Sequence, residues 1–162
     1  MSFEDIFHTD FAVANNAHAR VNLIGEHTDY TGGYVLPSLL NFKTTIRISK
    51  NESKKYQVYS EHFNEQIDFT DFIKSKNYKW VDYVKGCLFI FYDENKHIPN
   101  THLNIYISST IPIGRGISSS SALCVAVLKS LNSFFNTEYT EKHIAILAQK
   151  VERNYIGVSG GI

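Results

Sequence analysis

A glycine- and serine-rich segment at residues 111–122 constrains this chain more than any other feature. It reads I-P-I-G-R-G-I-S-S-S-S-A and joins two apolar patterns of different period. Residues 102–108 alternate, which predicts a half-buried strand, and apolar side chains follow the segment at helical spacing. The expected inward-facing positions of this strand and helix are Leu103, Ile105, Ile107, Leu123, Val127, Leu128 and Leu131. A strand that turns into a helix through closely spaced glycines is typical of a phosphate-binding loop.

Such a loop suits phosphate for physical reasons. Glycine lets the backbone approach the anion, and the helix behind contributes unpaired N–H groups and a positive dipole end. The hydroxyls of Ser118–Ser120 can bind Mg²⁺ or phosphate oxygens. The segment lacks the Gly-Lys-Ser/Thr ending of a Walker A loop and the third glycine of a dinucleotide fingerprint. A serine-rich helix N-cap after a tight turn remains an alternative, because short glycine motifs are common.

A second polar cluster follows an expected strand and reads R-V-N-L-I-G-E-H-T-D-Y-T-G-G over residues 20–33. Glu26 and Asp29 can each accept two hydrogen bonds from vicinal sugar hydroxyls, and His27 adds a donor or an acceptor. Arg20 is a fixed cation that can stabilise a phosphoryl transition state or lower the pKa of a neighbouring acid. Two alternatives are a solvated turn capped by Asp29 and a metal site built from Glu26, His27 and Asp29. Adjacent residues diverge on a strand, which disfavours the metal site.

Elsewhere the sequence predicts a short helix, two strands, a hairpin and two further helices. These elements lie at residues 2–8, 11–24, 34–48, 57–69 and 78–92, and from an N-cap at Thr140 to Gly157. The apolar stripes of the two later helices are Trp80, Val84, Cys87, Leu88 and Phe91, and then Ile144, Leu147, Ala148, Val151 and Tyr155. The pattern is that of one α+β domain whose strands and helices share a core.

Composition excludes several classes of protein. The 162 residues contain 43% hydrophobic and 20% charged residues, which is an ordinary globular balance. Sixteen Lys and Arg balance sixteen Asp and Glu, so a nucleic-acid partner is not expected. Cys87 and Cys124 are far apart in sequence and predict buried, reduced thiols. The sequence begins without a signal peptide, and its longest apolar run is too short to cross a bilayer, so we expect a cytoplasmic protein without a membrane partner.

Three segments together resemble the galactokinase branch of the GHMP small-molecule kinases. Residues 20–33, followed by Val35-Leu36-Pro37, resemble the sugar-binding signature of that family. Residues 112–122 resemble its Pro-x-Gly-x-Gly-Leu-Ser-Ser-Ser-Ala phosphate loop. Residues 152–161 resemble a third landmark, a Glu followed by an aromatic residue and then Gly-Val-x-x-Gly. The order and spacing of all three agree, so the resemblance covers essentially the whole chain.

The resemblance implies the fold and the domain organisation. It predicts the GHMP kinase N-terminal domain, a ribosomal-protein-like two-layer α+β fold with a mixed sheet and helices packed on one side. Residues 1–162 would form this one domain, and the C-terminal GHMP domain, the expected intramolecular partner, would be missing. The family pattern continues after Ile162 into Met-Asp-Gln, whose Asp is the catalytic base. The resemblance therefore implies an N-terminal part that is inactive alone.

The resemblance also implies the reaction, which is transfer of the γ-phosphoryl group of ATP to the anomeric hydroxyl of galactose with Mg²⁺. Arg20 would stabilise the transition state. The residues implied for galactose are Glu26, His27, Thr28, Asp29 and Gly160. Those implied for the nucleotide are Ser60, Gly114, Arg115, Gly116, Ile117, Ser118, Ser119 and Ser120. Mg²⁺ would be bound by Ser120 and Glu152, for which a solvated helix charge is the alternative.

The sequence departs from the family pattern at two places, and two other functions are alternatives to galactokinase. Ala17-His18-Ala19 stands where the family usually has Ala-Pro-Gly, and Arg115 replaces a small residue in the phosphate loop. The same fold also serves a non-catalytic regulator that binds galactose and ATP, or a kinase of N-acetylgalactosamine or another hexose. Such regulators tend to have a damaged phosphate loop, so the intact glycines and serines favour an enzyme.

Overall fold

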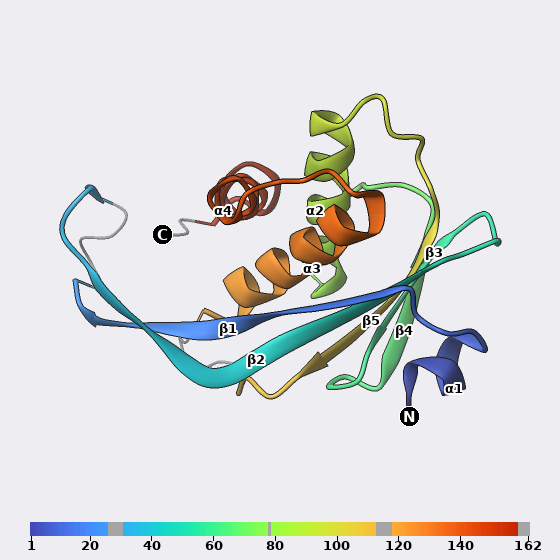
Figure 1. Cartoon of the computed structure of the whole chain (residues 1–162), viewed down its shortest axis with the longest axis horizontal. Helices are drawn as coiled ribbons and strands as arrows, with labels where there is room; N and C mark the ends of the chain where they lie inside the picture. Colours follow the sequence, from blue (N-terminus) through green and yellow to red (C-terminus); the bar gives the residue numbers. More distant parts are fainter. Residues whose placement is uncertain (26–30, 78, 113–117, 159–162) are drawn as a thin grey trace.

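The computed structural model describes residues 1–25, 31–77, 79–112 and 118–158. The chain forms a five-stranded sheet in the order β1-β2-β5-β3-β4, with the longer helices α2, α3 and α4 gathered on one face (Figure 1). The elements are α1 (Phe3–Phe7), β1 (Val13–Ile24), β2 (Leu36–Lys50), β3 (Tyr56–Ser60), β4 (Glu65–Phe69), α2 (Val81–Glu94), β5 (Leu103–Ser109), α3 (Ser119–Phe135), α4 (Glu141–Lys150) and the π-helix η2 (Val151–Ile156). The predicted α+β architecture is confirmed.

The sheet is mixed, as expected. β3 and β5 run parallel, while the other neighbouring strands are antiparallel. The predicted hairpin forms from β3 and β4, and Asn64 adopts a left-handed conformation with φ of 48° in its turn. Asparagine tolerates this conformation better than most residues, so the tight reversal has a local cause.

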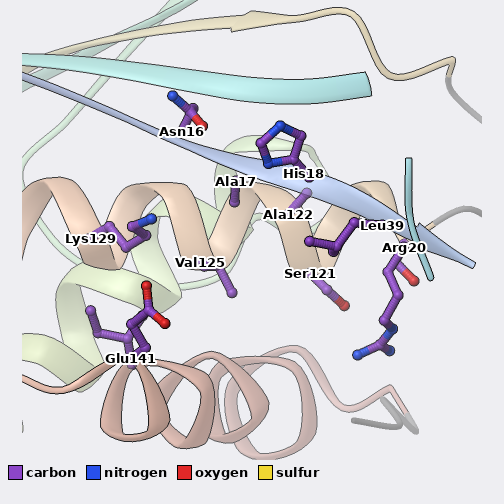
Figure 2. A pocket seen from close by; sticks show the side chains of 12 residues that line it. Asn16, Ala17, His18, Arg20, Leu39, Ser121, Ala122, Val125, Lys129 and Glu141 are labelled. Atoms are coloured by element: carbon purple, nitrogen blue, oxygen red, sulfur yellow. The ribbon is translucent and has the colours of Figure 1, made fainter. Parts of the chain in front are cut away.

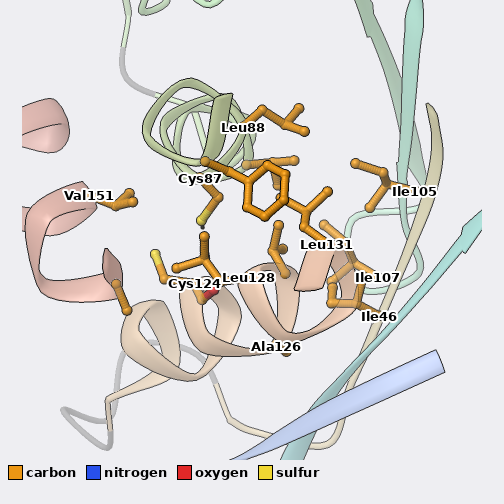
Figure 3. Packing of buried hydrophobic residues seen from close by; sticks show 14 of the residues in the cluster. Ile46, Cys87, Leu88, Ile105, Ile107, Cys124, Ala126, Leu128, Leu131 and Val151 are labelled. Atoms are coloured by element: carbon orange, nitrogen blue, oxygen red, sulfur yellow. Dashed lines mark hydrogen bonds between the residues drawn. The ribbon is translucent and has the colours of Figure 1, made fainter. Parts of the chain in front are cut away.

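The hydrophobic core lies between the sheet and the three longer helices. Ile46 and Ile105 from the sheet meet Leu128 and Leu131 from α3, and α2 covers the same space from above (Figure 3). Burying a side chain of this size stabilises the fold by about 1.5–3 kcal/mol. The predicted inward positions of α3 and of the last helix are confirmed, although Leu123 and Tyr155 are only partly buried.

The two cysteines are buried and reduced, as predicted. Cys87 on α2 and Cys124 on α3 face each other within the core, and the Cys87 thiol donates a hydrogen bond to the Cys124 carbonyl oxygen at 3.8 Å (Figure 3). A hydrogen bond with Cys87, together with burial, raises the pKa of the Cys124 thiol well above its ordinary value. Both groups therefore act as small apolar side chains that join the two helices.

The prediction that the strand at residues 102–108 is half-buried is wrong. β5 is the central strand of the sheet, and Asn104 and Tyr106, on the opposite face from Ile105, are also buried. The short helix α1 covers this second face, because Phe3 packs with Tyr59 and Tyr106 in a small separate cluster. The expectation of helices on one side alone thus holds for α2, α3 and α4 but not for α1.

Two helix boundaries differ from the predictions. α2 begins at Val81 rather than at residue 78, and Trp80 stands at its N-cap, partly buried against the core. The last helix changes type after Lys150, where η2 continues as a π-helix to Ile156. Gly157 ends it with φ of +90°, and its N–H donates to the carbonyl of Glu152, five residues earlier.

Within the described ranges, no helix is long and apolar enough to cross a bilayer. The cytoplasmic location stays a prediction of the sequence.

Candidate functional site

The first turn of α3 lies between two cavities. Ser119 and Ser120 line a cavity of about 600 Å³ that Ser60 also lines. Ser118 and Ser121 line a cavity of about 430 Å³ that Arg20 also lines. The structure thus brings five of the predicted site residues, and the whole serine run, to one helix start.

Ser118 occupies the N-cap position of α3 in an unusual way. Its backbone is left-handed, with φ of 57° and ψ of 40°, and its side chain makes no capping hydrogen bond within the described residues. An ordinary serine N-cap has an extended backbone and a hydroxyl that accepts from the first helical turn. The serine-capped turn offered as the alternative is therefore not how the described part of this helix begins. A non-glycine residue in this region costs free energy and is concentrated at functional sites.

The larger cavity has an aromatic wall. The rings of Phe63 and Trp80 stack with centroids 5.8 Å apart and an interplanar angle of 12°. The Trp80 indole N–H donates to Glu65 Oε2 at 3.0 Å, which fixes the ring, and Lys79 lies beside it at the cavity. Ser60, at the end of β3, is almost fully buried and lines the same cavity. A flat aromatic surface beside a cation and a helix N-terminus can accept a planar base with an attached phosphate.

The sequence interpretation missed Phe63 and Lys79 and assigned Trp80 to the core. A signal was present, because Lys79-Trp80 is a cation–aromatic pair directly before a helix, and Phe63 is a large apolar residue inside a predicted turn. Helical spacing alone placed Trp80 on the inward stripe. The structure places Trp80 both against the core and at this cavity.

Asp82 holds the segment that leads to this wall. Its carboxylate is 1% exposed and accepts from the Ser75 N–H at 3.0 Å, the Ser75 hydroxyl at 2.9 Å and the Lys79 N–H at 3.1 Å. Burial alone would raise the pKa of Asp82, but the hydrogen bonds from Ser75 and Lys79 bring it below its ordinary value. Lys85, one turn further along α2, donates to the Ile73 carbonyl at 2.9 Å. The segment between Ile73 and Lys79 is thus attached to α2 by hydrogen bonds at both of the segment's ends.

Arg20 lies on β1 beside the smaller cavity, which β1, α3 and α4 enclose (Figure 2). Its side chain and that of Ser121 extend into the same space, whereas Lys129 and Glu141 lie at the far end (Figure 2). The pairing of β1 with β2 shifts register between His18 and Arg20. Such irregularities bend a strand and re-aim the side chain that follows. Ala17 and Ala19, which flank His18 in the departure from the family pattern, are buried in the core.

Glu152 meets the serines from the other side. Its side chain is buried, at 4% exposure, and its Oε1 accepts from the Ser120 hydroxyl at 2.7 Å. The Ser121 hydroxyl lies 3.0 Å from Oε2 and 3.2 Å from Oε1. The alternative of a solvated helix charge is therefore wrong.

The pair of Ser120 and Glu152 fits a magnesium ion in chemistry. Hydroxyl and carboxylate oxygens are the ligands that this hard cation prefers, and it often takes only one or two protein carboxylates together with waters and phosphate oxygens. Among the described residues there is no group of three or more His, Cys, Asp or Glu side chains that could hold a metal. Magnesium would thus need oxygens from its nucleotide as well as from this pair.

Several predicted site residues lie outside the described residues. For the sugar these are Glu26, His27, Thr28, Asp29 and Gly160, and for the phosphate loop Gly114, Arg115, Gly116 and Ile117. Their roles stay predictions of the sequence, as does the metal-site alternative for Glu26, His27 and Asp29.

Comparison with known proteins places this geometry in a family. The family description "GHMP kinases N terminal domain" matches residues 82–162, which is half of the chain. The chain belongs to the GHMP kinase family. A second family description, the galactokinase galactose-binding signature, matches residues 1–50 of the chain. The two matches contain the two motifs on which the sequence interpretation rests.

The relatives that the chain resembles include galactokinases. The galactokinase of Pyrococcus furiosus is 43% identical over 143 residues, which is 88% of this chain and 40% of that protein. The galactokinase of Staphylococcus carnosus is 35% identical over 164 residues, which is 99% of this chain and 42% of that protein. The chain spans about two fifths of the length of the curated relatives it matches.

Solved structures agree with the family assignment. The structure of Lactococcus lactis galactokinase complexed with galactose superposes with a TM-score of 0.86 at 34% identity, covering 98% of this chain and 42% of that one. A mevalonate kinase superposes with a TM-score of 0.81 at 24% identity, over 90% of this chain and 48% of that one. The second likeness concerns the fold alone.

Proposed function

We propose that this chain is the N-terminal part of a galactokinase. That enzyme transfers the γ-phosphoryl group of ATP to the anomeric hydroxyl of galactose and yields galactose 1-phosphate and ADP. The observation that carries the proposal is the match of residues 1–50 to the galactokinase galactose-binding signature. The same chain has a GHMP kinase match over residues 82–162, so a sugar signature and a phosphate-loop domain occur together. Galactokinases at 35–43% identity support the same assignment.

We assign the nucleotide to the larger cavity. The stacked rings of Phe63 and Trp80 offer the base an apolar surface, with Ser60 beside it. The N-terminus of α3 directs its first-turn N–H groups and its positive dipole end toward the phosphates. Ser118–Ser120 continue the loop of Gly114, Arg115, Gly116 and Ile117, to which we assign the remaining phosphate contacts. These residues act by positioning charge, which is the main contribution a protein makes to phosphoryl transfer.

We assign the metal to Ser120 and Glu152. When bound there with the nucleotide, Mg²⁺ supplies neutralisation of charge on the phosphate oxygens. The burial of Glu152 and its 2.7 Å hydrogen bond to Ser120 hold both oxygens on the first turn of α3. A buried carboxylate that is already desolvated and directed gives up little freedom when contacts to a cation replace its hydrogen bond from the Ser120 hydroxyl.

We assign the sugar to Glu26, His27, Thr28, Asp29 and Gly160. Arg20, from the strand that leads into this signature, would stabilise the charge that develops on the transferred group. The family pattern has its catalytic base in the Met-Asp-Gln that follows the position of Ile162. We therefore propose that turnover requires this motif and the second domain of the family, the intramolecular partner of this one.

The test is sugar-dependent release of ADP by a protein that extends through the Met-Asp-Gln motif and the second domain. Galactose, N-acetylgalactosamine and glucose are compared, each with ATP and Mg²⁺. We expect turnover with galactose, and a loss of about 10²–10³-fold in kcat for Arg20→Lys, because a transition-state donor is displaced. Arg47→Lys is the matched control, since Arg47 lies on the far face of the sheet against Phe11 and Tyr106.

Other outcomes contradict the proposal in distinct ways. Turnover with N-acetylgalactosamine but not with galactose would identify a kinase of another hexose. Binding of both galactose and ATP without ADP release would identify a regulator. An equal loss of activity in Arg20→Lys and Arg47→Lys would remove Arg20 from the reaction.

A further inference from the structure

Tyr155 of η2 packs directly against Gly86 of α2, where residue 86 has no room for a side chain. A Cβ atom added to Gly86 would lie 2.6 Å from Tyr155 Cδ1 and 2.9 Å from Val151 Cγ1. Cβ atoms essentially never approach other heavy atoms so closely, and both contacts are with the inner part of a side chain. Gly86 is buried within α2, where glycine is a poor helix former. The close approach of η2 is the reason that glycine suits this position.

η2 presents different residues to its two neighbours. Val151 and Tyr155 meet α2 at Gly86, whereas Glu152 meets Ser120 and Ser121 on α3. The backbone bond from the Gly157 N–H to the Glu152 carbonyl spans five residues, so this turn is wider than an α-helical one. The position of the Glu152 carboxylate therefore depends on how closely the same turn packs on α2.

The hydroxyl of Tyr155 makes a second link. It donates a hydrogen bond to the backbone carbonyl of Phe72. Burial, with Asp82 and Asp71 contributing, raises the pKa of Tyr155 to about 12, so the hydroxyl stays protonated and remains a donor. Phe72 precedes the segment that Lys85 and Asp82 fix to α2 and that ends at the cavity with Lys79 and Trp80.

We infer that Tyr155, seated on Gly86, is a positioning residue for the nucleotide–metal site. Its ring sets the depth at which η2 packs, and so holds the Glu152 carboxylate on the first turn of α3. Its hydroxyl ties the same turn to the segment that carries Lys79 and Trp80. One side chain thereby fixes the position of the Glu152 carboxylate relative to the aromatic wall formed with Trp80. The inference rests on the proposed function, since it assigns a task to residues of the site proposed above.

Two variants separate this role from a general contribution to folding. Tyr155→Phe keeps the ring and removes the hydrogen bond to Phe72. Gly86→Ala should favour α2 by helix propensity, yet we expect it to displace the Tyr155 ring and with it η2. Tyr92→Phe is the matched control, because it removes a tyrosine hydroxyl that donates to the Thr101 carbonyl at 3.0 Å, near the other end of α2.

The measurement is calorimetric titration of ATP into the protein, once with Mg²⁺ and once with EDTA, so that catalysis is not required. We expect Mg²⁺ to tighten ATP binding in the wild type. In Gly86→Ala, which displaces the ring and η2, we expect this Mg²⁺-dependent gain to fall about three- to tenfold, the effect of one misplaced polar contact. In Tyr155→Phe, which keeps the ring and removes only the link to the segment of Lys79 and Trp80, we expect ATP binding in EDTA to weaken about three- to tenfold, because the aromatic wall loses that support. Tyr92→Phe should keep the wild-type affinity for ATP both with Mg²⁺ and with EDTA, even if its Tm falls.

Each result decides a separate question. A wild type that binds ATP neither with Mg²⁺ nor with EDTA would overturn the proposed function and this inference with it. A wild type that gains affinity from Mg²⁺, with cooperatively folded variants that keep both the same gain and the same affinity in EDTA, would overturn the positioning role alone. If Gly86→Ala does not fold, Tyr155→Phe decides the matter.

Discussion

Replacing Glu152 by glutamine should separate a metal ligand from a structural carboxylate. Glutamine has nearly the same shape, so the perturbation removes the charge and leaves the packing of η2 against α3. The carboxylate accepts hydrogen bonds from the hydroxyls of Ser120 and Ser121. In Glu152→Gln the amide oxygen can accept one of these, and the amide N–H₂ can donate to the other hydroxyl.

The opposing contributions to stability nearly cancel. A hydrogen bond to a charged group is worth about 1.5–3 kcal/mol and one between neutral groups about 0.5–1.5 kcal/mol, so two such bonds lose about 2–3 kcal/mol. Burying an unpaired carboxylate carries a penalty of several kcal/mol, which the neutral amide avoids. We therefore expect the free energy of unfolding of Glu152→Gln to stay within about 2 kcal/mol of the wild type, since these effects oppose each other.

Metal binding should respond in the opposite way. An amide oxygen carries no charge, so a hard divalent cation loses its anionic protein ligand. Urea unfolding measures the stability, and the Mg²⁺ concentration required for tight ATP binding measures the metal site. Glu94→Gln is the control, because Glu94 is an exposed carboxylate that pairs with Lys150 at the surface. A Glu152→Gln protein that unfolds far more easily but binds ATP with unchanged Mg²⁺ dependence would show that Glu152 is structural.

Three further predictions follow from the proposed site and from the buried hydrogen bonds. Asp29→Ala should weaken galactose binding by about 1–3 kcal/mol, because buried sugar hydroxyls lose their partner, and unchanged affinity in calorimetric titration would remove Asp29 from the site. Asp82 should contribute stability that is complete above its ordinary pKa of 3.8 and is lost as the pH falls through its lowered pKa. Acid titration of unfolding should therefore be shallower for Asp82→Asn than for the wild type, and parallel curves would contradict this reasoning. Residues 1–162 alone should release ADP at a rate at least about 10²–10⁴-fold below that of the extended protein, which includes the family's base, and comparable rates would refute the need for that base.

Short-range features of this fold were predictable because neighbouring residues decide them. Ser2 and Asp5 form a reciprocal capping box at the start of α1. Thr140 accepts from the His143 N–H at the start of α4, as predicted. Asn64 permits the left-handed turn of the hairpin. Each depends on side chains within a few positions of one another, so the local sequence contains the necessary information.

The sequence alone determined which residues could do chemistry, and the tertiary structure decided which of them meet. The serine run and Glu152 stand 32 positions apart along the chain, and only the packing of η2 between α2 and α3 brings their oxygens to 2.7 Å. Trp80 has the spacing of a core residue and packs against the core, yet it also lines a cavity, where Phe63 of the hairpin stacks on its ring. The second buried face of β5 likewise depends on α1, about a hundred residues earlier in the chain. Hydrophobic periodicity predicts that a side chain is buried. Which residues bury it is decided by packing between segments that are distant in the sequence.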